Sequence, residues 1–307
     1  MIPPRFDRAD DFSEGLAAVQ LGQVFGYVDP TGSLVLTPRQ ERAGTLHRRF
    51  SDGLALVRQG RQHGFIDRDG QVAIPLRFVG ADDFSEGYAL ACSEVGCGYI
   101  DRTGRGVIPD QFMASPPVRG GVACVTLAMG MSRQRVALYP IGGARIGGDF
   151  EGCGAASEGL IAVRAGGKWG YLDAAGHGVI APRFEWAGEF SEGLAPVGDD
   201  SGRCGYVDRT GAFAIPPRFG ACHPFSGGLA RVDLAKDEGE APQVAFVDRT
   251  GTPKIVGRDL RPPFDTAEDF VNGLAAVGQG GEPFLAGNGV NLGYVDRTGA
   301  YVWTPTR

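Results

Sequence analysis

Cysteine and histidine are the residues of this chain whose types and spacing could support metal binding or nucleophilic chemistry. Cys92 and Cys97 form a Cys-x4-Cys pair, but a tetrahedral zinc site needs a second Cys or His pair to complete four ligands, and none accompanies it. Without an N-terminal export signal, free thiols in a reducing compartment are expected. The same six-cysteine set includes Cys124, Cys153, Cys204 and Cys222.

Cys222 and His223 are adjacent, and a Cys–His pair can act as nucleophile and base when the two side chains meet. Adjacent residues of an extended strand point to opposite faces, so this pair is poorly placed for catalysis. The other histidines, His47, His63 and His177, have no neighbouring cysteine that suggests chemistry. The sequence therefore predicts no enzyme, no metal and no cofactor.

Aspartate recurs in the pattern Asp-x-x-Gly, which invites comparison with calcium-binding repeats. Calcium needs several oxygen ligands within a few residues, whereas the intervening pair here is often Arg-Thr. An Asp that caps a turn and a Gly at positive φ are typical of a hairpin connection. We interpret these segments as turns. They are Asp29–Gly32, Asp67–Gly70, Asp101–Gly104, Asp173–Gly176, Asp208–Gly211, Asp248–Gly251 and Asp296–Gly299.

These turns belong to a repeat that occupies nearly the whole chain. A Gly-Leu pair or its variant begins each copy, at spacings of 38, 34, 34, 38, 34, 35 and 45 residues. A Gly-aromatic-aliphatic-Asp segment follows each pair, except in the fourth copy. The regular spacing predicts eight units. The first glycines of the units are Gly15, Gly53, Gly87, Gly121, Gly159, Gly193, Gly228 and Gly273.

Each unit is predicted to contain three short strands. The first is continuously apolar, as expected of a strand covered on both faces. The second alternates an aromatic and an aliphatic side chain, and the third should end at a proline such as Pro75 or Pro216. The link to the next unit contains two phenylalanines that should fill the seam between units. No segment has a helical period with caps, so helix should be scarce.

A unit this small cannot bury its own faces, so stacking must supply the core. The predicted fold is all-β, with about eight tandem three-stranded β-meander repeats stacked in an open solenoid-like superhelix as a single domain over residues 1–307. A closed β-propeller is the alternative. Both chain ends have the sequence of a unit's third strand, which slightly favours the open array. The predicted units are 6–38, 50–75, 78–109, 112–148, 150–182, 184–216, 219–262 and 264–305.

Composition limits the partners. The chain has 307 residues and a net charge of −6, with acidic and basic residues mixed throughout, which argues against nucleic-acid binding because no basic stripe forms. No apolar run approaches the roughly 18 residues of a membrane helix. The N-terminus lacks the features of a signal peptide, so a cytoplasmic location without membrane contact is expected.

The unit from Ser157 to Phe184 resembles the bacterial WG-containing repeat, also called KWG. It contains Lys168-Trp169-Gly170-Tyr171-Leu172-Asp173, and the resemblance extends over almost all of residues 6–305. The eponymous Trp occurs once, at Trp169. Its place is taken in other units by Phe25, His63, Cys97, Cys204 and Leu292. The resemblance implies a binding or scaffold module in a bacterium, and by analogy with repeat proteins beside secreted toxins, an immunity protein.

The link between the first and second strands is expanded in three units, at Thr126 to Arg135, Leu234 to Gln243 and Gly278 to Leu292. Insertions at one point of a repeat should emerge from one edge, and such an edge often binds partners. The predicted binding residues are Leu127, Met129, Met131, Lys236, Asp237, Glu238, Glu240, Phe284 and Leu285.

The predicted function is thus a non-enzymatic protein-binding scaffold, with an immunity protein that neutralises a toxin domain as one specific form. A carbohydrate- or small-ligand-binding array is the alternative, using aromatic residues such as Trp186 and Trp303. An enzyme with a site in a propeller channel is a third hypothesis. It requires Cys, His and carboxylate side chains to converge in space.

Overall fold

A computed structural model describes residues 6–22, 24–36, 45–112, 118–127, 135–234, 243–278 and 292–303. Within these ranges the chain is built from β-strands, together with one short 3-10 helix, η1 (Gly257–Asp259). The prediction of an all-β protein with little helix is confirmed. No helix among the described residues is long and apolar enough to cross a membrane.

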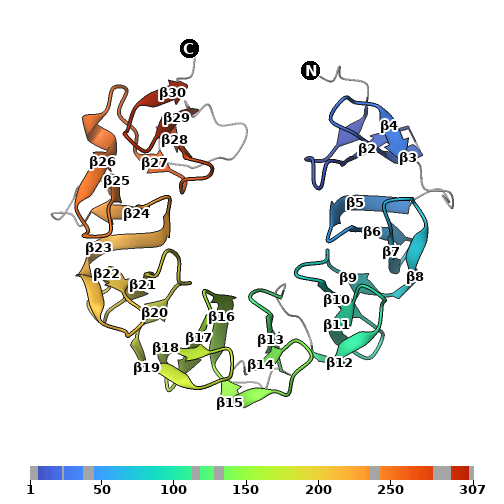
Figure 1. Ribbon diagram of the computed structural model, residues 1–307, viewed down its shortest axis with the longest axis horizontal. Coiled ribbons are helices and arrows are strands. Elements are labelled where there is room, and N and C mark those ends of the chain that lie inside the picture. Colours follow the sequence, from blue (N-terminus) through green and yellow to red (C-terminus); the bar gives the residue numbers. More distant parts are fainter. Residues whose placement is uncertain are drawn as a thin grey trace. The chain divides into compact units, whose positions relative to one another are not determined.

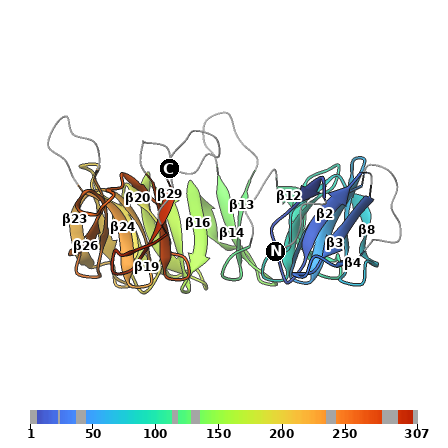
Figure 2. The same ribbon diagram turned by 90° about the horizontal axis from the view of Figure 1, so that it is seen from above.

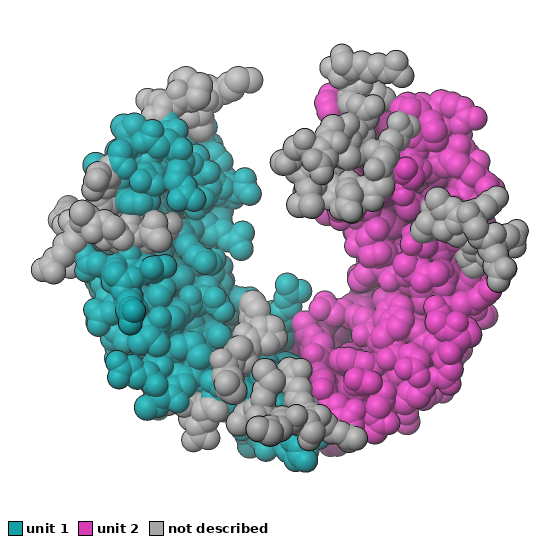
Figure 3. All heavy atoms as spheres, turned by 180° about the vertical axis from the view of Figure 1, so that it is seen from behind, with its two compact units in different colours: residues 1–149 teal, residues 150–307 magenta. Residues whose placement is uncertain are grey.

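The chain divides into two compact units, residues 1–149 and residues 150–307 (Figure 3). Within the described residues, unit 1 contains three sheets of four strands and one of three (Figure 1). We call the antiparallel strands of one repeat a blade and number the blades along the chain, so that a blade is one sheet except where two consecutive blades share a strand. Blade 1 consists of β1 (Arg8–Ala9), β2 (Ala17–Leu21), β3 (Val24–Val28) and β4 (Leu34–Leu36). Blade 2 consists of β5 (Thr45–Ser51), β6 (Leu54–Gln59), β7 (Gln62–Ile66) and β8 (Val72–Phe78). Blade 3 consists of β9 (Gly80–Ala81), β10 (Tyr88–Cys92), β11 (Cys97–Asp101) and β12 (Gly106–Phe112). Blade 4 consists of β13 (Val122–Thr126), β14 (Val136–Pro140) and β15 (Ile146–Phe150).

Unit 2 contains blades 5 to 8. Its described strands form two four-stranded sheets and a seven-stranded sheet, in which blades 6 and 7 share β23. Blade 5 consists of β16 (Gly152–Ser157), β17 (Leu160–Ala165), β18 (Lys168–Asp173) and β19 (Gly178–Phe184). Blade 6 consists of β20 (Trp186–Ala187), β21 (Ala195–Gly198), β22 (Cys204–Val207) and β23 (Phe213–Ser226). Blade 7 adds β24 (Leu229–Leu234), β25 (Gln243–Val247) and β26 (Pro253–Val256) to β23. Blade 8 consists of β27 (Thr266–Ala267), β28 (Leu274–Gly278), β29 (Leu292–Asp296) and β30 (Tyr301–Trp303).

The prediction of an open solenoid is wrong, and the β-propeller alternative matches the structure. In a β-solenoid, strands of successive repeats would pair with one another. Here the described strands pair in antiparallel order within each blade (Figure 2), and among the described strands only β23 is shared by two consecutive blades. The predicted three-stranded unit also gains a strand, because the link between units forms the first strand of the next blade. Successive antiparallel four-stranded sheets are the blades of a propeller.

The fourth strands do not end at proline as predicted. β8 continues through Pro75, and β23 continues through Pro216. Both prolines lie in a register shift, between Phe65↔Ile74 and His63↔Phe78 in blade 2 and at the equivalent place in blade 6. A bulge leaves a residue unpaired, so the missing proline N–H removes no ladder hydrogen bond.

The bulge explains the glycine of the Gly-aromatic segment. A Cβ on Gly170 would lie 2.4 Å from the Ile180 carbonyl oxygen and 2.6 Å from the Pro182 nitrogen. Gly64 and Gly205 face the same backbone approach in blades 2 and 6. The bulged fourth strand therefore presses its main chain against the third strand, where only glycine fits.

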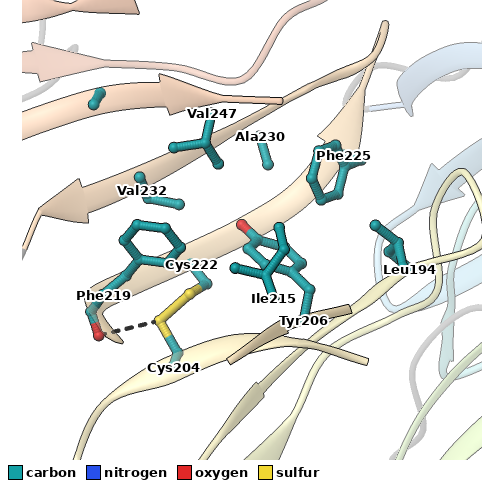
Figure 4. Packing of buried hydrophobic residues seen from close by; sticks show 11 residues of the cluster. Leu194, Cys204, Tyr206, Ile215, Phe219, Cys222, Phe225, Ala230, Val232 and Val247 are labelled. Atoms are coloured by element: carbon teal, nitrogen blue, oxygen red, sulfur yellow. Dashed lines mark hydrogen bonds between the residues drawn. A yellow bond between two sulfur atoms is a disulfide. The ribbon is translucent and has the colours of Figure 1, made fainter. Parts of the chain in front are cut away.

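The hydrophobic core lies between consecutive blades rather than within one blade. In unit 2, Tyr206 of blade 6 packs against Phe225 of blade 7 with ring centroids 4.9 Å apart, inside a cluster that draws on both blades (Figure 4). Phe50, Phe84, Phe190 and Phe270 occupy the same position and are buried. The prediction that the linking phenylalanines fill the seams is confirmed for the second phenylalanine of these five links, whereas Phe12, in the link before blade 1, is exposed. Tyr294 belongs to blade 8, the last of unit 2, and is 44% exposed.

Polar side chains repeat the same connections across several seams. The Ser191 hydroxyl donates a hydrogen bond to the Phe225 carbonyl at 2.6 Å, and the Glu192 carboxylate accepts one from the Gly228 N–H at 3.0 Å. The Arg218 guanidinium stacks 5.1 Å from the centroid of the Phe219 ring, within the range of a cation–π contact, and donates to the Gly251 carbonyl at 2.7 Å. The arginines at this position, Arg77, Arg183 and Arg218, thus bond to a backbone carbonyl of the next blade.

The Asp-x-x-Gly segments are turns, as predicted. Asp208 Oδ1 accepts hydrogen bonds from the Thr210 hydroxyl at 2.6 Å and from the Thr210 and Ala212 N–H groups. These hydrogen bonds, that of the Thr210 hydroxyl first, lower the pKa of the Asp208 carboxyl. Gly211 has φ +87°, which places it in the left-handed region. Each aspartate therefore acts as a cap for its own turn.

Candidate functional site

The expanded links join the second and third strands of blades 7 and 8, and the corresponding strands β13 and β14 of blade 4. Their bounds match the strand ends: β13 ends at Thr126, β24 ends at Leu234 and β28 ends at Gly278. In an antiparallel blade, these links lie at one end of the strands and the Asp-x-x-Gly turns lie at the other. The two insertions of unit 2 consequently leave equivalent ends of blades 7 and 8.

Of the predicted binding residues, Leu127 alone lies among the described residues. Its N–H donates to the Arg135 carbonyl at 2.9 Å, and its side chain packs against the core between blades 3 and 4. Leu127 thus closes the base of its link. Outside the described residues lie Met129, Met131, Lys236, Asp237, Glu238, Glu240, Phe284 and Leu285. Their role in binding stays a prediction.

The expectation of free thiols is wrong. Cys204 and Cys222 form a buried disulfide between β22 and β23 (Figure 4), and Cys92 and Cys97 form one across β10 and β11. The sequence hid these pairs because Cys222 lies outside the repeated Trp position that Cys97 and Cys204 share. The sulfur of Cys222 is therefore bonded and offers no nucleophile beside His223.

His223 belongs instead to a charged cluster at the seam of blades 7 and 8. Its Nδ1 lies 2.9 Å from an Arg231 Nη, and the Arg231 Nε donates to Asp269 Oδ1 at 3.2 Å. Burial, and then the Arg231 charge, lower the pKa of His223. A neutral imidazole accepting from Arg231 fits this arrangement. No nucleophile joins the cluster among the described residues, so it is interpreted as structural.

Unit 1 has an equivalent cluster at the seam of blades 2 and 3. Arg48 and His223 both lie two residues before the linking phenylalanine, and Asp83 and Asp269 both lie one residue before the next one. Asp83 Oδ2 lies 3.7 Å from Arg49 Nε and 4.0 Å from an Arg48 Nη. Burial raises the pKa of the Asp83 carboxyl, while the two arginines oppose that effect.

A cleft of about 210 Å³ lies at the seam of blades 1 and 2. Its lining combines charged, amide and aromatic groups, from Arg8, Asp10, Ala18, Gln20, Phe25 and Arg48. The sequence analysis missed this site because its residues belong to four different strands. Two sequence features pointed to this site. Phe25 occupies the Trp position of the repeat, and the first predicted strand of the same unit has Ala18 where two later units have leucine.

Comparison with known proteins places the chain among repeat proteins. The WG containing repeat matches residues 1–24, 25–61, 64–94, 146–169, 169–201, 205–234 and 261–282, which is more than half of the chain. The chain therefore belongs to the WG-repeat family, as the resemblance of its motifs indicated. No curated protein matches it.

Solved structures share the fold at low sequence identity. A eukaryotic initiation factor is 12% identical with a TM-score of 0.60, over 96% of this chain and 85% of that chain. BamB from Moraxella catarrhalis is 12% identical with a TM-score of 0.44, over 97% of this chain and 87% of that chain. AztD from Citrobacter koseri, also 12% identical, has a TM-score of 0.44 over 97% of this chain and 92% of that chain. At this identity the likeness concerns the fold alone, and only the first supports it.

Proposed function

We propose that this WG-repeat chain is a non-enzymatic protein-binding scaffold, and that its partner contacts the end of the blades where the second and third strands are linked. The observation that carries this proposal is the distribution of variation among the repeats. The opposite end carries the repeated Asp-x-x-Gly turns. The seams reuse one set of Ser, Glu and Arg contacts. Length varies at the links, from the two-residue turn Gly166-Gly167 to the span between Gly278 and Leu292.

The physical reason is that a residue whose contacts hold two blades together cannot be substituted to fit a partner without weakening the seam. Ser51, Ser85, Ser157 and Ser226 all donate to a carbonyl of the next blade, so changes there would weaken the seam. A link that extends beyond its hairpin makes no such contribution, and rigid scaffolds commonly present binding residues on such connections.

The specific form of this proposal is an immunity protein that neutralises a bacterial toxin. The support is the family resemblance alone, and the proposal of a cytoplasmic location belongs with it. Disulfides persist mainly in oxidising compartments, and this chain contains them. Fractionation of the native cell, with alkylation of free thiols before lysis, tests the location. Recovery of the protein from the cytoplasmic fraction, with Cys92, Cys97, Cys204 and Cys222 unalkylated because they are paired, is the expected result.

The scaffold proposal is tested by shortening the three links. In one variant, residues 127–134, 235–242 and 279–291 are each replaced by Gly-Gly, the turn of blade 5. In a second variant, the residues of each link are scrambled at constant length and composition, which separates the effect of link sequence from that of link length. The native chain, fixed to a column, should capture a partner from its own cell that mass spectrometry identifies. Both altered chains should lose that partner while retaining a native circular dichroism spectrum. Retention of the partner by the shortened chain would contradict the proposed surface.

Carbohydrate binding is a second candidate, favoured by one exposed aromatic pair. Tyr294 and Trp303 of blade 8 have ring centroids 6.2 Å apart, and Trp303 is 52% exposed. Trp186, by contrast, lies across Gly198, where a Cβ would approach its Nε1 to 2.1 Å. Screening the chain on a glycan array, with Trp303→Ala as the comparison, tests this candidate. Equal signals from both chains would eliminate the pair as a sugar platform.

A further inference from the structure

The cleft between blades 1 and 2 has a floor built by cross-strand neighbours. Arg8 lies opposite Gln20, and Gln20 lies opposite Phe25, on β1, β2 and β3. Residues directly opposite in an antiparallel sheet share a face. Ala18 lies two residues from Gln20 along β2 and so shares that face. This is the face toward blade 2, because Ala18 packs in the cluster that contains Phe50. Asp10 follows β1, where its N–H donates to the Ala18 carbonyl at 2.9 Å, and it belongs to the cleft lining.

Arg48 of β5 forms the opposite wall of the cleft. Its backbone is fixed by the Tyr27 hydroxyl, which donates to the Arg48 carbonyl at 2.8 Å. The cleft is therefore bounded by two blades whose relative position is set by a hydrogen bond and by the Tyr27–Phe50 ring contact, with centroids 4.7 Å apart. A site held between two packed blades is preorganised, which lowers the entropic cost of binding.

The equivalent rows of blades 3 and 5 are filled. In blade 3 the row contains the disulfide between Cys92 and Cys97. In blade 5 the Trp169 ring extends over Gly152, where a Cβ would lie 3.2 Å from the ring. In blade 1 the Trp position holds the smaller Phe25, so the space that an indole would fill is left as the cleft. The cleft thus results from a departure from the repeat, as expected of a site rather than of the scaffold.

The charges in the cleft define the ligand. Among the described residues, the Arg8 side chain has no hydrogen-bond or ion-pair partner. Arg48 reaches a carboxylate only at 4.0 Å, and it shares that Asp83 with Arg49. Guanidinium groups recognise carboxylates through paired N–H donors. Asp10 adds one negative charge to the same lining, and the Phe25 ring adds an apolar wall.

We propose that this cleft binds a free α-amino acid with an apolar side chain. Its carboxylate would pair with Arg8 and Arg48, its ammonium group would face Asp10, and its side chain would pack on Phe25. A volume of about 210 Å³ is below the roughly 300 Å³ at which pockets for drug-sized ligands begin, so the ligand is of single-residue size. The proposal does not depend on the protein-binding function proposed above.

Calorimetry on the full chain tests the proposal with L-phenylalanine as the probe. Two analogues separate the contacts: 3-phenylpropanoate lacks the amine and phenethylamine lacks the carboxylate. N-acetyl-phenylalanine stands for the C-terminus of a peptide. We expect saturable binding of L-phenylalanine, at least tenfold weaker binding of 3-phenylpropanoate and N-acetyl-phenylalanine, and none of phenethylamine. Binding of N-acetyl-phenylalanine equal to that of the free amino acid would overturn the assignment, since the ligand would then be a peptide end.

Variants locate the site. Arg8→Gln and Arg48→Gln should each weaken binding at least tenfold, and Phe25→Trp should abolish it by filling the cleft as Trp169 fills its row. Arg58→Gln is the matched control, because Arg58 occupies the position of Gln20 in blade 2 and its Nε already donates to the Gly60 carbonyl. Unchanged binding in Phe25→Trp, an equal loss in Arg58→Gln, or no saturable binding by the unaltered chain would overturn the proposal.

Discussion

Single residues in this protein are constrained mainly by backbone approach and by seam contacts. Gly170 illustrates the first constraint. Its neighbour Trp169 gives the family its name, yet the Trp position accepts Phe, His, Cys and Leu in other units, whereas the glycine is required by the bulged strand beside it. A side chain that packs can be exchanged for another, but a Cβ cannot occupy the space of a main-chain atom.

Replacing Gly170 with Ala should therefore destabilise blade 5 strongly. We expect a loss of about 3 kcal/mol in the free energy of unfolding, the upper end for overpacking, because the contacted atoms belong to the backbone of β19. Urea denaturation followed by tryptophan fluorescence measures it. Gly178→Ala in the same blade is the control, since a Cβ at that position would meet no atom within 4 Å. Equal losses in the two variants would contradict the steric argument.

His223 makes stability depend on pH. Its folded-state pKa lies below its ordinary value of about 6.5, because burial and Arg231 disfavour the imidazolium. The unfolded chain then binds the proton first as pH falls through 6.5, so stability is lost on acidification and is fully present above that pH. The negative charges of Asp269, whose Oδ1 lies 3.9 Å from His223 Nδ1, and of Asp233 and Glu268 oppose the effect in part.

Urea denaturation at pH 8 and at pH 5.5 measures this dependence. His223→Gln should reduce the loss of stability on acidification by about 1.4 kcal/mol for each unit by which the pKa is lowered. The pKa of His63 is also lowered by burial, so His63 adds to the loss of stability on acidification. The double variant His63→Gln/His223→Gln should therefore lose less stability between pH 8 and pH 5.5 than either single variant. A steeper pH dependence in His223→Gln would show that the ring is charged in the folded protein.

At the scale of elements, three blades are joined to the next blade by an arginine that follows the bulge, at Arg77, Arg183 and Arg218. Arg183 stacks on the Phe184 ring at 4.9 Å and donates to the Gly211 carbonyl of blade 6. The interaction needs a planar donor that can stack and bond at once, which lysine cannot supply. This explains why arginine recurs at positions 77, 183 and 218.

Arg183→Lys should accordingly lower the free energy of unfolding by about 1 kcal/mol, the range of an exposed cation–π contact and one hydrogen bond. Thermal and urea denaturation measure the loss. Arg203→Lys, in the exposed turn between β21 and β22, serves as the comparison and should change stability by less than about 0.5 kcal/mol. If both variants behave alike, positive charge alone accounts for the arginine that recurs at this position of the repeat.

The Cys204–Cys222 disulfide fixes the third strand of blade 6 to β23, which continues into blade 7. The cysteines are 18 positions apart in sequence, and closing a loop of this size stabilises a fold by about 3 kcal/mol. The variant Cys204→Ala/Cys222→Ala should lose stability of that order. Reductant should lower the urea midpoint of the native chain and leave that of the variant less affected. Identical responses to reductant would indicate that this disulfide does not form.

On the scale of the whole molecule, stability is distributed over seams within two compact units. Each large core cluster joins two consecutive blades. A destabilising substitution in one seam should therefore cause local unfolding of the two blades that form that seam before the other blades unfold, as in other repeat proteins. Phe84 and Phe225 are the linking phenylalanines of one seam in unit 1 and one in unit 2, and both are fully buried.

Phe84→Ala and Phe225→Ala form a matched pair for this expectation. Each should cost about 3–5 kcal/mol locally. Hydrogen exchange read by mass spectrometry should show faster exchange in blades 2 and 3 for the first variant, and in blades 6 and 7 for the second. Equal acceleration throughout the chain in either variant would mean that the two units unfold as one cooperative body.

The repeat pattern was enough to predict the all-β class, the family, the turn caps and the seam phenylalanines. These features depend on residues close in sequence, whose periodicity reports local geometry. The repeat pattern could not predict which strands pair between repeats, because that pairing depends on contacts beyond neighbouring residues. A three-stranded unit with an extended link is compatible with a solenoid or a blade, and only the pairing of β9 with β10 and of β20 with β21 decided for the blade.

The tertiary structure also decided the features that depend on residues far apart in the chain. Proline could continue a strand because a bulge removed the need for its N–H. The cysteines could pair because the shared β23 brings Cys222 against Cys204. The cleft exists because Arg48 of blade 2 faces Arg8 and Phe25 of blade 1. The sequence alone determined how each blade forms, since turns and alternation act over a few residues. The seams, and the sites within them, required the packing of one blade against the next.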